Sequence, residues 1–201
     1  INESNTRMDH LDISVLAVLL AEACNIGFSP VSKEGIESLK YDRLMYVNHQ
    51  YVRLDTLSAT NKKIISAYKK LPISLVWGNN QMASADGIRY TTPQRSLYSR
   101  SNPKYFGRSR GVTFYNFVSD QYIGFHGMVV PGTLRDSLYL LDGFLNQTSG
   151  LEPKQIMTDT AGYSDLVFGL FGLLGFQFSP RIANNHGTKL WRIDLTADYK
   201  M

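Results

Sequence analysis

Two aspartates occur in motifs that could hold a divalent metal. Asp86 lies in the segment 83–87 (ASADG) and Asp159 in the segment 157–162 (MTDTAG), and each is placed where a strand is expected to end in a turn. Magnesium prefers oxygen ligands and keeps several waters, so one or two carboxylates with phosphate oxygens form an ordinary site. In a two-metal site, one ion activates the attacking oxygen and the other stabilises the leaving oxygen of an in-line displacement. The pair therefore suggests metal-dependent chemistry on a phosphodiester.

The same two aspartates have a second explanation. Asp-Gly and Asp-Thr sequences are common at turns, where the short carboxylate bonds nearby backbone. In that case Asp86 and Asp159 would be turn or cap residues that take no part in chemistry. Their spacing alone leaves both interpretations open.

A basic segment follows the first aspartate. Residues 87–110 contain no acidic side chain, while six cations alternate with aromatic residues. Arginine and lysine bind phosphates, and aromatic rings can stack on bases, so the segment suits a nucleic acid. An exposed basic loop would have the same composition. The candidate DNA contacts are Arg89, Arg95, Arg100, Lys104, Arg108 and Arg110.

Composition limits the class of protein. The 201 residues, 43% of them hydrophobic, are enough for one sizeable core or two small ones. The formal charge of +4 agrees with a polyanionic partner. The longest apolar run, residues 13–23, is too short to span a bilayer, so no membrane contact is expected. The lone Cys24 excludes an internal disulfide, and its apolar helical surroundings predict a buried structural thiol in a reducing compartment.

Two regions must position these residues. In residues 1–71 apolar side chains recur at helical spacing, and Asp9 or Asp12 is expected to cap the first helix. From residue 72 to residue 201 the pattern changes to strands alternating with helices. Strands are predicted at 73–77, 112–119, 121–130, up to 158 and at 177–182, with helices at 134–145 and 166–174.

The order of these elements predicts an α+β fold, in which a helical region precedes a ribonuclease H-like mixed sheet with flanking helices. In such a sheet the first strand lies beside the strand that ends at Thr158. The two aspartates would then come together at one edge of the sheet.

Long ordered motifs run through the chain. The most specific is 158–165 (TDTAGYSD), which leads into 173–176 (LLGF) and 179–182 (SPRI). Others are 111–115 (GVTFY), 118–121 (VSDQ), 134–136 (LRD), 140–143 (LLDG), 23–28 (ACNIGF), 71–73 (LPI) and 77–78 (WG). Together they resemble the replicative transposases of the class II bacterial transposons, the Tn3 family, over most of the chain.

That resemblance implies a DDE/D-type recombinase with a ribonuclease H-like core. Its expected reaction is Mg²⁺-dependent hydrolysis, with Mn²⁺ as a substitute, that frees 3′-hydroxyls at transposon ends and lets them attack target DNA. By motif position, Asp86 is the first catalytic and metal-binding aspartate and Asp159 the second. Asp165 falls at the start of a helix and is interpreted as a cap. Arg181 is placed to contact DNA or to pair with a core carboxylate.

The resemblance also implies partners and a location. Double-stranded DNA, as transposon ends and target, is the expected substrate. Because two ends must be brought together, the full-length protein is expected to be a homo-oligomer. Its expected place is the bacterial cytoplasm, in association with the nucleoid.

The chain departs from the family pattern in three ways. Segment 77–80 (WGNN) lacks the usual acidic residue after Trp-Gly, and segment 83–85 (ASA) replaces consecutive serines. No glutamate follows Asp159, so the third catalytic carboxylate has no counterpart and the core is expected to stop before it. The isolated chain is therefore predicted to bind metal weakly and to cleave DNA poorly or not at all.

A second class of function stays open: a DNA-binding or assembly module on a ribonuclease H-like scaffold that has lost catalysis, with both aspartates kept for folding. Carboxylates within about 4–6 Å of a shared opening would favour the catalytic core. A carboxylate that caps a helix, or that lies buried away from the basic segment, would favour the module.

Overall fold

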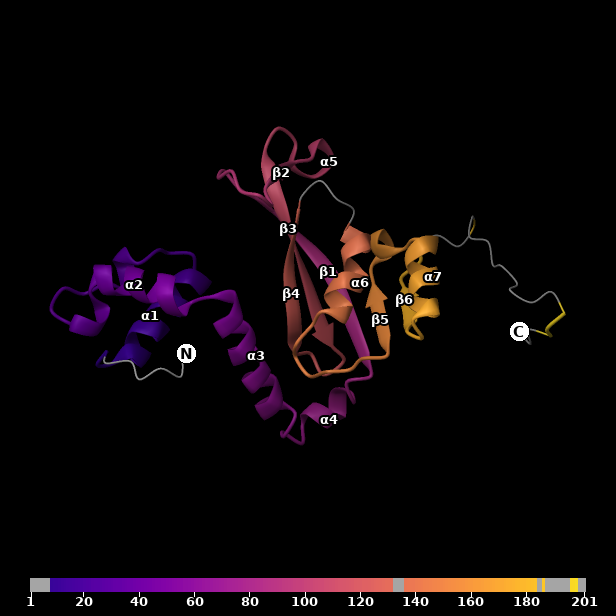
Figure 1. Ribbon diagram of the computed structural model, residues 1–201, viewed down its shortest axis with the longest axis horizontal. Coiled ribbons are helices and arrows are strands. Elements are labelled where there is room, and N and C mark those ends of the chain that lie inside the picture. Colours follow the sequence, from indigo (N-terminus) through magenta and orange to yellow (C-terminus); the bar gives the residue numbers. More distant parts are fainter. Residues whose placement is uncertain (1–7, 132–135, 184–185, 187–195, 199–201) are drawn as a thin grey trace. The chain divides into compact units, whose positions relative to one another are not determined.

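The computed structural model describes residues 8–131, 136–183, 186 and 196–198. The chain forms two compact units, Ile1–Pro72 with Thr148–Gly150 and Ile73–Gln147 with Leu151–Met201. Among the described residues, the first unit is helical and the second contains the sheet (Figure 1).

From residue 8 onward, where its description begins, the first unit contains three α-helices and two single-turn 3-10 helices. Its small core joins α1 to α2, and the buried hydroxyl of Ser14 donates to the carbonyl of Ser38 at 2.7 Å. The same hydroxyl accepts a hydrogen bond from Nε of Arg43 at 2.9 Å. The elements are α1 (Leu11–Ala23), η1 (Ser29–Val31), η2 (Glu37–Leu39), α2 (Tyr41–Tyr51) and α3 (Leu54–Tyr68).

Two expectations for the first helix are wrong. His10, in the left-handed conformation with φ of 54°, precedes α1 and makes no side-chain cap, so neither Asp9 nor Asp12 is the cap. Cys24 is exposed, whereas its surroundings predicted burial. It lies one residue beyond the end of α1, where the periodicity of the helix no longer decides which way a side chain faces.

The second unit is built around one mixed sheet. From one edge to the other the strand order is β4-β3-β1-β5-β6, and the short β2 also pairs with β3. Its elements are α4 (Ser74–Trp77), β1 (Met82–Thr91), β2 (Arg100–Ser101), α5 (Pro103–Phe106), β3 (Arg110–Ser119), β4 (Gly124–Pro131), η3 (Asp136–Leu138), α6 (Tyr139–Leu145), β5 (Gln155–Thr158), η4 (Thr160–Gly162), α7 (Asp165–Leu173) and β6 (Gln177–Pro180).

The directions of the strands define the fold class. β3 runs antiparallel to both β1 and β4, while β5 is parallel to β1 and β6 is parallel to β5. Taking the five longer strands in chain order, this is the order of a ribonuclease H-like sheet. The predicted α+β fold with a mixed sheet and flanking helices is confirmed.

The first predicted strand is wrong. Residues 73–77 were expected to be extended, but Ser74–Trp77 form the short helix α4. The first strand of the sheet is instead β1, which begins at Met82, five residues after the end of α4. Asp86 therefore lies in the middle of a strand and not at its end.

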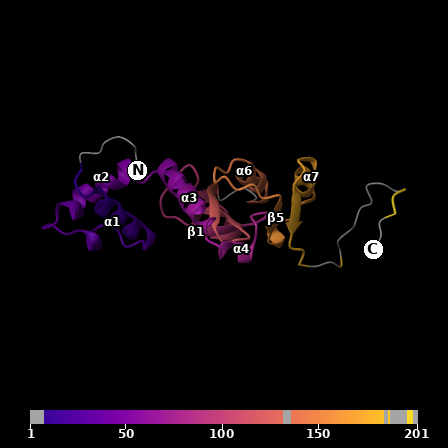
Figure 2. The same ribbon diagram turned by 90° about the horizontal axis from the view of Figure 1, so that it is seen from below.

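Side chains of the sheet alternate between two faces. On one face, Ala83 and Ala85 of β1 and Phe117 of β3 are buried. Helices α6 and α7 lie over this face in two perpendicular views (Figure 1, Figure 2). The ring of Phe171 on α7 stacks on Phe178 of β6, with 5.2 Å between ring centroids. The opposite face, which carries Asp86, is considerably more exposed.

The turn after β3 fixes the start of β1. Oδ1 of Asp120 accepts a hydrogen bond from the backbone N–H of Asn80 at 2.9 Å, and Nε2 of the buried Gln121 donates to the carbonyl of Gly78 at 2.8 Å. A Cβ on Gly78 would lie 2.4 Å from the carboxylate carbon of Asp120, so only glycine fits there. These contacts hold the strand that carries Asp86.

Candidate active site

The pairing of β1 with β5 brings the two aspartates together. Ala85 pairs with Thr158 in the last step of this parallel ladder. Asp86 and Asp159 are the next residues on each chain segment. Because neighbouring strands lie about 4.8 Å apart, the two backbones are adjacent at this point.

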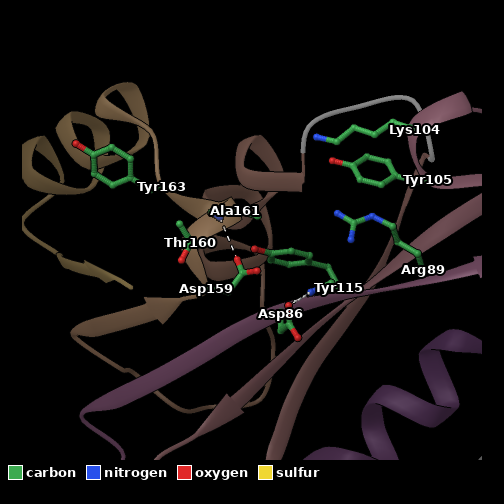
Figure 3. Close-up of a pocket in the computed structure, with 11 residues that line it drawn as sticks. Asp86, Arg89, Lys104, Tyr105, Tyr115, Asp159, Thr160, Ala161 and Tyr163 are labelled. Atoms are coloured by element: carbon green, nitrogen blue, oxygen red, sulfur yellow. Dashed lines mark hydrogen bonds between the residues drawn. The ribbon is translucent and has the colours of Figure 1, made fainter. Parts of the chain in front are cut away.

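Both aspartates line one pocket of about 200 Å³ (Figure 3). Its wall combines acidic, basic and aromatic side chains from β1, α5, β3 and the segment after β5. The remaining lining residues are Gly87, Arg89, Lys104, Tyr105, Tyr115, Thr160, Ala161, Gly162 and Tyr163.

Each carboxylate accepts a local backbone hydrogen bond. Oδ1 of Asp86 accepts from the N–H of Gly87 at 2.8 Å. Oδ1 of Asp159 accepts from the N–H of Gly162 at 3.1 Å, which makes Asp159 the N-cap of η4. The shared pocket is the arrangement that favours a catalytic core, and the cap is the one that favours a structural role. The geometry therefore supplies support for both interpretations.

Gly162 holds the second carboxylate in place. A Cβ at this position would lie 2.5 Å from Oγ1 of Thr158, so the close return of η4 onto the end of β5 requires glycine. The same residue donates the N–H that orients Asp159. This contact explains why glycine is needed three residues after the aspartate.

The basic residues separate into two groups. Arg89 and Lys104 line the pocket, whereas Arg95, Arg100, Arg108 and Arg110 are not among its lining residues. The candidate Arg181 is exposed just after β6. Its backbone N–H donates to the carbonyl of Thr158 at 2.9 Å, which places Arg181 near the end of β5 but outside the pocket wall.

Asp165 does not cap α7. Ser164 is the N-cap residue, and Asp165 is the first residue of the helix. Oδ1 of Asp165 accepts a hydrogen bond from the hydroxyl of Tyr163 at 2.8 Å. That hydrogen bond raises the pKa of Tyr163. Tyr163 lines the pocket, so Asp165 is connected to the site through it.

Sequence reasoning missed two tyrosines of the pocket wall, Tyr115 and Tyr163. Tyr115 is 3% exposed and lies opposite Gly87 in the β1–β3 ladder. In Figure 3 its ring reaches toward Asp159. The alternation of β3 could have placed Tyr115 on the covered face, but only the pairing with β1 shows that this position borders the pocket.

Each aspartate of the pocket has one carboxylate oxygen that could serve as a ligand for a divalent cation. Among the described residues, Oδ2 of Asp86 and Oδ2 of Asp159 make no hydrogen bond, and a carboxylate can accept through both oxygens. Both residues are exposed. Within the part of the chain that the structure describes, no third acidic, histidine or cysteine side chain joins them.

Comparison with known proteins identifies the class. The family model for the Tn3 transposase DDE domain matches residues 1–201. The chain is 52% identical over 199 residues, 99% of its length, to the transposase for transposon gamma-delta of Escherichia coli (strain K12), and 44% identical over the same share to the transposase for transposon Tn4556 of Streptomyces fradiae. The chain belongs to the Tn3 transposase DDE domain family.

The match concerns a part of the relatives. The chain spans 20% of the length of the gamma-delta transposase and 22% of the Tn4556 transposase. Among solved structures, it is similar to the piggyBac transposase synaptic complex with hairpin DNA, with a TM-score of 0.40 and 10% identity over 90% of this chain and 44% of that one.

None of the helices in the described residues has the length and apolarity needed to cross a membrane.

Proposed function

We propose that this chain forms the catalytic core of a DNA transposase, in which Asp86 and Asp159 bind a divalent metal ion, Mg²⁺ or its substitute Mn²⁺. The observation that carries the proposal is the β1–β5 register, which makes the two aspartates neighbours in one pocket. A cation between them would offset the repulsion of two close carboxylates. Sequence similarity to a part of the gamma-delta transposase supports the same proposal.

The substrate of this reaction is a DNA phosphodiester. A metal ion in the pocket would supply charge stabilisation and a more acidic water for an in-line displacement. Asp86 and Asp159 would hold the metal, while Arg89 and Lys104 in the same pocket would neutralise phosphate charge. The proposed outcome is the release of 3′-hydroxyls at transposon ends and their joining to target DNA.

The proposal extends to the surroundings of the whole protein. Double-stranded DNA is its partner, and two copies bring the two transposon ends together. It acts in the bacterial cytoplasm on the nucleoid. Outside the pocket, Arg95, Arg100, Arg108, Arg110 and Arg181 supply further phosphate contacts along the DNA.

This chain by itself should be a weak catalyst. Because no third carboxylate joins the pair among the described residues, metal affinity rests on two ligands. We expect weak Mg²⁺ binding and little or no DNA cleavage. Robust Mg²⁺-dependent nicking by this chain would contradict that expectation.

A second candidate is a DNA-binding or assembly module without catalysis. It is favoured by one observation: Asp159 caps η4 and so has a structural use that needs no metal. In this reading Asp86 and Asp159 are kept because they stabilise the turns around them.

Manganese binding distinguishes the two candidates. Calorimetry on the chain and on its Asp86→Ala and Asp159→Ala variants should show a heat of binding that both substitutions remove. Glu152→Ala is the matched control, because Glu152 is an exposed carboxylate just before the opposite end of β5. Circular dichroism confirms that all variants are folded.

The outcomes separate cleanly. Loss of binding in both folded aspartate variants, but not in Glu152→Ala, supports the metal site and the transposase core. A parent chain that binds no Mn²⁺, together with a lower melting temperature for Asp159→Ala, supports the module instead.

A further inference from the structure

Two cations of the pocket, Arg89 and Lys104, lie near the ring of Tyr105. The guanidinium carbon of Arg89 lies 3.9 Å from the centroid of the Tyr105 ring. Nζ of Lys104 lies 5.1 Å from the same centroid. Both distances are within the range of about 6 Å over which a cation is attracted to an aromatic face. Tyr105 therefore gathers two positive charges at one end of the pocket (Figure 3).

The short helix that carries Tyr105 is anchored to the rest of the sheet unit. Lys104 and Tyr105 belong to α5, whose N-cap Asn102 accepts the backbone N–H of Lys104 at 3.2 Å. The next residue, Phe106, is 7% exposed and packs against Gly111, where a Cβ would lie 2.2 Å from its ring. This contact attaches α5 to β3, so Tyr105 is carried by an anchored turn.

The contact with Tyr105 restricts the positions that the Arg89 guanidinium can take. Stacking engages the face of the planar guanidinium, whereas phosphate oxygens approach its N–H edge. An arginine that is already oriented loses less side-chain entropy when it binds. The contact with Tyr105 thus lowers the entropic cost of a contact between Arg89 and an oxyanion.

The distance of Arg89 from the two aspartates indicates which phosphate of a DNA strand it would contact. Arg89 lies three residues after Asp86 on β1, so their Cα atoms are roughly 10 Å apart. The pocket consequently has an acidic end at the two aspartates and a basic end at Arg89 and Lys104. A DNA strand offers a phosphate at every nucleotide, so a strand that places one phosphate at the acidic end places another toward the basic end.

We propose that Arg89, oriented by Tyr105 and assisted by Lys104, binds the DNA backbone phosphate next to the one held at the aspartates. The inference rests on the proposed function for the identity of the ligand as DNA. Tyr105 is a positioning residue in this assignment, because it acts on the phosphate through Arg89.

Salt-dependent DNA binding tests the assignment without catalysis. Fluorescence anisotropy of a short labelled duplex is measured in EDTA between about 25 and 200 mM salt. Arg89→Ala should weaken binding about tenfold at low salt and lower the slope of log K against log salt by about one, as expected for one lost phosphate contact. Tyr105→Leu should weaken binding severalfold, while Tyr105→Phe, which keeps the ring, should bind as the parent does.

Two comparisons make the test specific. In the Arg89→Ala background, Tyr105→Leu should add almost nothing, because the ring acts through the arginine. Lys154→Ala removes an exposed charge just before the start of β5, at the end of the strand away from the pocket. This variant should leave the slope nearly unchanged. Circular dichroism excludes unfolding as the cause of any loss.

Each failure has its own meaning. A parent chain that binds no duplex at low salt, a folded Arg89→Ala variant with an unchanged slope, or equal losses for Tyr105→Leu and Tyr105→Phe would overturn the phosphate assignment. The DNA-binding measurement is made without metal, so it can succeed where the manganese experiment on the aspartates fails. The manganese experiment can likewise succeed where the DNA-binding measurement on Arg89 fails.

Discussion

The two faces of the sheet differ in what their residues do. The face under α6 and α7 carries Phe117, Ile156 and Phe178, each at most 6% exposed. The opposite face carries Ile88 and Tyr90 at 50% and 52% exposure, in the same strand as Asp86. β1 therefore contributes to the core through one face and carries Asp86 on the other, while the pocket residues Arg89 and Tyr115 follow the alternation of the covered face. Substitutions of the buried residues under α6 and α7 should act through stability, and substitutions on the exposed face should cost much less.

The largest expected contrast is between two phenylalanines of β3. Phe117→Ala on the covered face should lower the free energy of unfolding by about 3–5 kcal/mol, because it leaves a cavity beneath α6. Phe114→Ala on the open face should cost about 1 kcal/mol, the loss of a cross-strand contact. Urea unfolding of both variants measures the difference. Equal costs would break the distinction between the faces.

Two helical glycines sharpen the comparison. A Cβ on Gly143 of α6 would lie 2.5 Å from the Phe117 ring, so Gly143→Ala should destabilise by about 1–3 kcal/mol. Among the described residues, a Cβ on Gly169 in α7 would meet no atom within 4 Å apart from the backbone of its own helix, so Gly169→Ala should stabilise by up to about 1 kcal/mol through helix propensity. Thermal melting gives the sign of each change. A stabilising Gly143→Ala would show that α6 can move away from the sheet.

Gly162 of η4 tests whether one residue can affect both stability and the pocket. Gly162→Ala should displace η4 from Thr158 and cost about 1 kcal/mol of stability, while also weakening any Mn²⁺ binding by Asp159. The control is Gly172→Ala, because a Cβ there meets nothing within 4 Å. Calorimetry and urea unfolding on the same samples measure both effects. Unchanged Mn²⁺ affinity in the folded variant would separate η4 from metal binding.

The smallest expected effect is a pH dependence on the covered face. Partial burial lowers the pKa of His126, and the nearby Asp142 carboxylate only partly opposes this. Because the unfolded chain binds the proton more readily, His126 contributes stability above about pH 6.5 that is lost as the pH falls through its lowered pKa. His126→Phe should reduce this acid loss, while the exposed His49→Gln should not. Melting curves from pH 7.5 to 5 measure it, and identical curves for the parent and His126→Phe would contradict it.

Local patterns predicted the second half of the sheet unit well. The strands β3, β4 and β6 and the helix α7 all begin and end within three residues of their predicted places, and β5 ends at its predicted residue. Helix α6 covers 139–145 of the predicted 134–145, and residues 134–135 of that prediction lie outside the described residues. These segments are rich in β-branched and aromatic residues or have clear helical spacing, so local preference and final packing agree.

The start of the sheet unit was predicted poorly, because there local preference and packing disagree. Residues 73–77 have high β-propensity but form α4, whereas β1 begins Met-Ala-Ser-Ala-Asp-Gly, a poor strand sequence by composition. β1 is extended because β3 and β5 supply hydrogen bonds on both of its edges. Such pairing is invisible to a local pattern.

The sequence by itself determined the family, the α+β class and the two aspartates as candidates, because these depend on residue types in a fixed order. Only the tertiary structure decided that Arg89 and Lys104, but not Arg95 or Arg108, lie in the pocket with them. Which member of a basic segment reaches a site depends on strand pairing and on the anchoring of α5 by Phe106. Both are contacts between residues distant in sequence, so their outcome follows from packing and not from composition.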